Sequence, residues 1–162
     1  MSARARSVVE ALTHVSPVAA AFRFPSTGRS IGLAREALRH QLRGWGLVGE
    51  LAEDAVLLVS EMVTNAVKAE PAIGCEVAVR FVVTAGCLRL EVHDASSQLP
   101  VMTNPEEDDE CGRGLVLLNA LASGWGVITD GIGKTVWVEL VLPDNPVPSL
   151  PKLLGLRNSG RE

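Results

Sequence analysis

The chain has 162 residues, of which 47% are hydrophobic, and it carries a formal net charge of −4 with a pI near 5.4. This length and apolar content predict one globular domain with a substantial core. The acidic balance and the scattered lysines and arginines disfavour direct nucleic-acid binding, and no apolar run approaches the length of a membrane span. The three cysteines follow no metal-ligand spacing, which predicts reduced thiols in a cytoplasmic protein.

The first elements follow from apolar spacing. Residues 1–17 are expected to form a loosely ordered arm, and an apolar run at residues 18–24 predicts a short strand that ends before Pro25. Serine and threonine residues then offer N-caps for a first helix, whose apolar residues recur at helical spacing as far as Gly44. A second helix is expected at residues 48–69, before a proline and a glycine.

The second helix carries the most informative pair of residues, Glu61 and Asn65. Four helical residues turn about 400°, so the carboxylate and the amide lie on one face and can act on one ligand. Such a pair suits the activation of water or a hydroxyl beside a magnesium-bound phosphate. The alternative is a solvated stripe shared with Ser60, Thr64 and Lys68. Serine, threonine and asparagine are weak helix formers, which favours a cavity wall.

The second half of the chain alternates between strands and a helix. Four strands are expected, at residues 76–83, 88–94, 124–129 and 135–142. The segment between the two hairpins is long for a connection and ends in five consecutive acids, which is typical of a functional lid or of disorder. A helix opens after it, and the proline-containing tail at residues 143–162 is predicted to be disordered.

This order of elements predicts an α+β domain over residues 18–142, a two-layer sandwich in which a mixed, mostly antiparallel sheet has its helices on one face.

Asp94 ends a strand, where its carboxylate can accept the amino hydrogen of adenine or can cap the following turn. Gly112 and Gly114 open a helix, where free N–H groups favour a phosphate, although glycines also punctuate loops. Thr135 can add a hydroxyl or be an ordinary strand residue.

The order of these motifs resembles the N, G1, G2 and G3 boxes of the GHKL (Bergerat-fold) ATPases over residues 18–142. The matching motifs are Glu61-x-x-x-Asn65, Asp94, Gly112-Arg113-Gly114-Leu115 and Gly133-Lys134-Thr135. Within that superfamily, Ser-Glu-Met-Val-Thr-Asn-Ala-Val, Gly-Arg-Gly-Leu and Gly-Lys-Thr-Val-Trp are most similar to the anti-sigma-factor serine kinases of the RsbW and SpoIIAB type.

The resemblance implies an ATP-binding regulator that uses Mg²⁺ and phosphorylates a serine or threonine of a STAS-type antagonist, sequesters a sigma factor, or does both. It implies that Glu61 is the general base, that Asn65 contacts the Mg²⁺ and that Asp94 recognises adenine. The implied nucleotide-binding set is Asn65, Asp94, Gly112, Arg113, Gly114, Leu115 and Thr135. In this set the glycines let the lid close on the phosphates, the arginine adds a phosphate contact, and the threonine assists at the adenine end.

Two departures from the family pattern keep a second function open. The G1 box reads Asp94-Ala95-Ser96-Ser97 where relatives have glycines, and Lys68-Ala69-Glu70 follows the N box where many relatives have a histidine. The alternative is therefore a catalytically weak or inactive nucleotide-binding module that regulates its partner by sequestration.

The first helix is the predicted partner surface. Its arginines place positive charge on an otherwise acidic chain, which would steer acidic regulators to it. The alternative is an ordinary solvated helix face, and a homodimer is a further arrangement that the resemblance leaves open.

Overall fold

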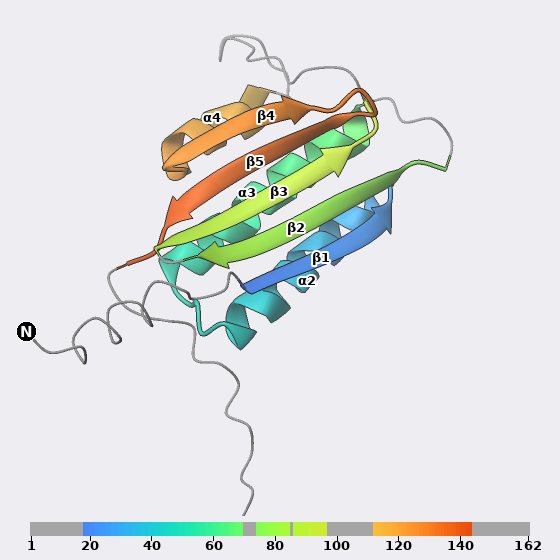
Figure 1. Ribbon diagram of the computed structural model, residues 1–162. Coiled ribbons are helices and arrows are strands. Elements are labelled where there is room, and N and C mark those ends of the chain that lie inside the picture. Colours follow the sequence, from blue (N-terminus) through green and yellow to red (C-terminus); the bar gives the residue numbers. More distant parts are fainter. Residues whose placement is uncertain (1–17, 70–73, 85, 97–111, 144–162) are drawn as a thin grey trace, which may run out of the picture.

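The computed structural model describes residues 18–69, 74–84, 86–96 and 112–143 (Figure 1). The described elements are β1 (Val18–Pro25), α2 (Arg29–Gly44), α3 (Glu50–Lys68), β2 (Glu76–Thr84), β3 (Cys87–Asp94), α4 (Gly112–Leu121), β4 (Gly124–Thr129) and β5 (Lys134–Val141). They follow the expected order, with boundaries that differ by a residue or two. Within these ranges, no helix is long and apolar enough to cross a membrane.

The strands form one sheet in the order β1-β2-β3-β5-β4, and each neighbouring pair is antiparallel. The helices lie together on one face of it (Figure 1). The predicted two-layer α+β sandwich is confirmed, with the described strand pairs antiparallel throughout rather than mixed. Because β5 lies between β3 and β4, the last residue of β3, Asp94, is opposite the first residue of β5, Lys134.

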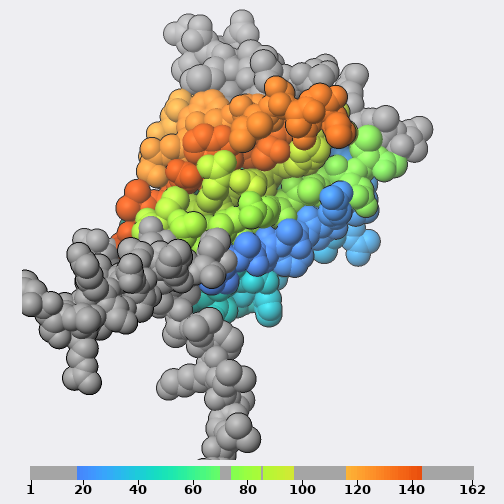
Figure 2. All heavy atoms as spheres, viewed as in Figure 1, coloured from blue at the N-terminus to red at the C-terminus, as the bar shows by residue number. Residues whose placement is uncertain are grey.

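Burial alternates along the strands and assigns each side chain to a face of the sheet. In β3, Leu88, Leu90 and Val92 are buried against the helices, and the residues between them are half-exposed. The open face, toward the viewer in Figure 2, is polar along β3 and mixed along β5, where Trp137 and Val141 alternate with Thr135 and Glu139. There the guanidinium of Arg89 lies 4.3 Å from the ring centroid of Trp137. Apolar residues facing the helices therefore build the core between the two layers.

Helix α3 lies in the middle of the helical layer, with α2 along one flank and α4 along the other (Figure 1). Its sheet-facing residues are Ala55, Leu58, Val59, Met62, Val63 and Ala66. Gly49 immediately precedes the helix with a φ of 80°, in the left-handed region that favours glycine. The helix therefore begins at Glu50, later than the apolar pattern predicts.

Candidate functional site

Glu61 and Asn65 are half-buried residues on the side of α3 away from α2. Ser60 lines a hollow toward α2, and each helical residue advances by about 100°, so Glu61 and Asn65 turn toward the α4 side. Thr64 donates its hydroxyl to the carbonyl oxygen of Ser60 at 2.7 Å, so the helix backbone satisfies it. The predicted polar stripe thus divides between the two flanks of the helix, and the predicted pair stays together.

Asp94 continues the buried side of β3, so its carboxylate points between the sheet and the helices. The residue is only 4% exposed. Its Oδ1 accepts the backbone N–H of Ser96 at 2.8 Å, which is the turn-capping contact of the alternative interpretation. The same oxygen accepts from the Nζ of Lys134 at 3.2 Å. Asp94 is therefore both a turn cap and one half of a buried ion pair.

The helix-facing side of β5 differs from the prediction by one residue. The strand begins at Lys134, whose side chain lies on the same face as Val136 and Val138 and is buried, as Val138 is. Thr135 is opposite His93 and Ile128 and points to the open face, because strand side chains alternate. The structure therefore does not bring Thr135 to Asp94. Lys134 stands at that position, and counting by two from the apolar residues of β5 would have identified it.

The turn before β5 fixes the position of this lysine. The N–H of Ile132 donates to the Asp130 carboxylate and lowers its pKa, helped by the N–H of Gly133 and by the nearby His93. A Cβ on Gly133 would overlap the carbonyl oxygen of Asp94, so only glycine allows the turn to approach β3 this closely. The turn and the end of β3 are thus packed backbone to backbone.

The predicted phosphate-binding motif begins α4, whose first residue is Gly112. The side chains of Arg113 and Leu115 lie outside the described residues, as does the acidic segment before the helix. The structure describes the backbone at Gly112 and Gly114, which forms the N-terminus of α4, and α4 contacts α3.

The described site residues gather at one end of the sandwich. Helix α3 packs on β3, and the two run in the same direction (Figure 1). Asn65 lies in the last turn of α3 and Asp94 ends β3, so both lie at that end. In the described part of the chain, no three His, Cys, Asp or Glu residues cluster as metal ligands. Mg²⁺ needs few protein ligands when phosphates and waters complete its shell, so one amide oxygen fits it.

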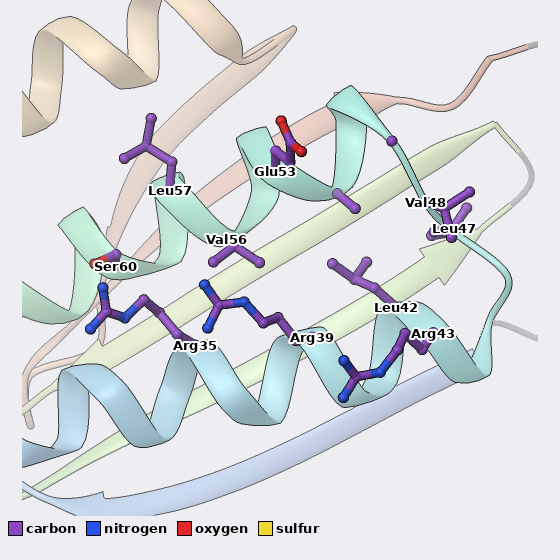
Figure 3. A pocket seen from close by; sticks show the side chains of 12 residues that line it. Arg35, Arg39, Leu42, Arg43, Leu47, Val48, Glu53, Val56, Leu57 and Ser60 are labelled. Carbon is purple, nitrogen blue, oxygen red and sulfur yellow. The ribbon is translucent and has the colours of Figure 1, made fainter.

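A separate hollow of about 460 Å³ lies between α2 and α3 (Figure 3). One wall carries Arg35, Arg39 and Arg43, spaced four residues apart along α2, and α3 contributes Glu53 and apolar side chains. The arginines can be read from the sequence, whereas the hollow arises only when the two helices pack together.

Comparison with known proteins identifies the fold. A family model described as the histidine kinase-like ATPase domain matches residues 24–140. The chain is similar to the solved RsbU and RsbW domains of Rv1364c from Mycobacterium tuberculosis, at 22% identity and a TM-score of 0.57, over 78% of this chain and 32% of that chain. It is also similar to the histidine kinase domain of the Erythrobacter litoralis EL346 blue-light activated histidine kinase, at 26% identity and a TM-score of 0.47, over 72% of this chain and 61% of that chain. No curated protein matches the chain.

The chain thus spans about a third of the first solved structure and less than two thirds of the second. The first of these likenesses supports the fold alone, while the family model covers well over half of the chain. The fold predicted from the motif order is confirmed, and the chain belongs to the family of histidine kinase-like ATPase domains.

Proposed function

We propose that this protein binds Mg²⁺-ATP at the α3 and β3 end of the sandwich and transfers phosphate to a serine or threonine of a protein partner. Membership of the ATPase family implies nucleotide binding. The observation that carries the proposal is that Asn65, in the last turn of α3 and one turn after Glu61, lies at the same end of the sandwich as the buried Asp94.

Each residue has a role suited to its chemistry. Bound ATP supplies the phosphoryl group, and Mg²⁺ neutralises charge on its oxygens. The amide oxygen of Asn65 holds the metal, and Asp94, an acceptor, receives the amino hydrogen of adenine. Glu61, one turn from Asn65, takes the proton of the acceptor hydroxyl as general base. The N–H groups that begin α4 at Gly112 and Gly114 favour the phosphates.

The proposed partner belongs to a partner-switching system, either a STAS-type antagonist that receives the phosphate or a sigma factor that is held. Similarity to the structure that contains the RsbU and RsbW domains supports this class of partner. The hollow between α2 and α3 is the proposed contact surface, because its arginines attract an acidic partner while apolar side chains such as Val48, 74% exposed, offer area to bury.

A second candidate function is nucleotide binding, or partner binding, without catalysis. The observation that favours it is the ion pair between Asp94 and Lys134, since the predicted adenine acceptor already has an internal partner. Sequestration of a regulator would then be the whole activity.

Calorimetry with ATP, with and without Mg²⁺, tests the binding step. Phosphotransfer is then measured with radiolabelled ATP on partners that co-purify with the protein. Glu61→Gln should retain ATP binding and lose transfer, whereas Glu53→Gln makes the same change two turns earlier in α3, at the hollow, and should keep both. Nucleotide binding by the wild type with no transfer to any partner would favour the non-catalytic function.

A further inference from the structure

The ion pair between Asp94 and Lys134 is unusual because both side chains are almost fully buried, at 5% and 6% exposure. Burying two charges requires a large desolvation free energy, and replacing such a pair by apolar residues is often neutral or stabilising. The pair is therefore weak evidence for a purely structural role. Its position at the end of β3, where the nucleotide base is expected, suggests a role in recognition.

The pair keeps hydrogen-bonding capacity. A lysine ammonium has three donors, and a carboxylate has about four acceptor positions. Within the described residues, one carboxylate oxygen of Asp94 accepts hydrogen bonds from Ser96 and Lys134. The ammonium of Lys134 makes one hydrogen bond there, to that same oxygen. Donor and acceptor are thus adjacent, 3.2 Å apart, with capacity for a further ligand.

Neighbouring backbone holds the two groups in register. Lys134 is the strand partner of Asp94. Asp94 is the last helix-facing residue of β3, and Lys134 is the first helix-facing residue of β5. The close approach of Gly133 to the Asp94 carbonyl and the turn closed by Asp130 fix the lysine backbone. The carboxylate of Asp94, an acceptor, and the ammonium of Lys134, a donor, are therefore held side by side in a fixed arrangement.

We propose that Lys134 is a specificity-determining residue that donates a hydrogen bond to N1 of the purine while Asp94 accepts from the 6-amino group. This inference rests on the proposed function. Adenine presents a donor at position 6 and an acceptor at N1, which complements an acceptor beside a donor. Guanine in the same orientation presents an acceptor at O6 and a donor at N1, so both contacts would be mismatched. Binding of guanine would leave the buried carboxylate and ammonium unpaired, which strongly favours adenine over guanine.

Ligand analogues test the inference on the unaltered protein. Calorimetry would compare ATP, 1-deaza-ATP, which lacks the N1 acceptor, and 7-deaza-ATP, which changes an atom outside the proposed contacts. Loss of a hydrogen bond to a charged donor should weaken 1-deaza-ATP by about tenfold to a hundredfold and leave 7-deaza-ATP nearly unchanged. Equal affinities for ATP and 1-deaza-ATP would overturn the inference.

Substitution of the lysine completes a thermodynamic cycle. Lys134→Met should bind ATP and 1-deaza-ATP equally, because the same contact is missing in both complexes. Lys134→Gln keeps an N–H donor and should recover part of the discrimination, and urea unfolding of both nucleotide-free variants reports whether they fold. Tighter ATP binding by Lys134→Met would contradict the inference and identify the lysine as a competitor of the base.

Failure of this inference and failure of the proposed function differ in outcome. Wild-type protein that binds ATP with no dependence on N1 removes the role of Lys134 alone. Wild-type protein that binds none of the three nucleotides overturns both.

Discussion

The surroundings on the two flanks of α3 differ in chemistry, because α2 brings its arginines to one flank only. The α4 flank carries half-buried oxygen groups, on Glu61 and Asn65, at the end of the sandwich where Asp94 is buried. The α2 flank faces an open hollow whose wall is lined by arginines (Figure 3). A small ligand with phosphates suits the first, and a protein with acidic groups suits the second. The comparison predicts that substitutions on each flank affect one function and spare the other.

The largest effect is expected at Glu61. Glu61→Gln should lower the rate of phosphotransfer by about 10²–10⁴-fold, the usual range for a lost general base, with ATP affinity nearly intact. Single-turnover transfer to a co-purified partner would measure it. The matched change Glu53→Gln, at the hollow two turns earlier in α3, should leave the transfer rate within about twofold. A similar loss in both variants would break the comparison between the flanks.

Asp94→Asn should have the next largest effect, because it changes two properties together. The amide can present a donor where adenine also presents one, so ATP affinity should fall and ATP/GTP discrimination should narrow. Breaking a buried ion pair leaves Lys134 uncompensated, so the free energy of unfolding should decrease by about 3 kcal/mol. Urea denaturation and nucleotide titration measure the two separately. Unchanged selectivity in a destabilised variant would reduce Asp94 to its turn-capping and ion-pair roles.

Asn65→Ala tests the metal contact. The variant should weaken Mg²⁺-ATP by about tenfold and Mg²⁺-free ADP much less, because only the first complex uses the amide oxygen. Thr64→Ala is the control, since the hydroxyl of Thr64 bonds to the carbonyl oxygen of Ser60. Equal losses for the two ligands in Asn65→Ala would remove Asn65 from the metal site.

The sequence predicted most of the fold because its signals are local. Alternating burial in β3 and helical spacing in α3 both match the expected periods. Thr135 was expected at the nucleotide site, and in the structure its side chain points to the open face of the sheet. The predicted strand began at Thr135 and the described strand begins at Lys134. Side chains two residues apart share a face of a strand, so Lys134 joins the helix-facing row of Val138 and Leu140. A buried lysine is rare without a partner, and that partner lies forty residues away.

The hollow between α2 and α3 was beyond sequence reasoning for a different reason. The sequence indicated that the first helix carries arginines, Arg35, Arg39 and Arg43 among them, but not whether they face water or a neighbouring helix. The packing of two helices joined by a short turn decides this, and α3 adds Glu53 and Leu57 to the opposite wall. The residues proposed for the site on the other flank could be named from the sequence because they belong to separate motifs in a fixed order.

The smallest effect is expected on the α2 flank, in the double reversal Arg35→Glu with Arg39→Glu. Arg39 already pairs with Glu36 at 3.0 Å, with nearly half of its side chain exposed, and exposed charge pairs contribute only about 0.2–1 kcal/mol each. Reversal replaces attraction by repulsion, so binding of an acidic STAS or sigma-factor partner should weaken by about tenfold at low salt and less at physiological salt. ATP affinity should not change, because these arginines lie on the flank away from Asn65.

Arg23→Glu with Arg80→Glu makes the same charge change on the open face of the sheet and serves as the control. Titration of a labelled partner at two salt concentrations measures the difference, and equal weakening by both pairs of reversals would show that net charge, rather than the hollow, attracts the partner.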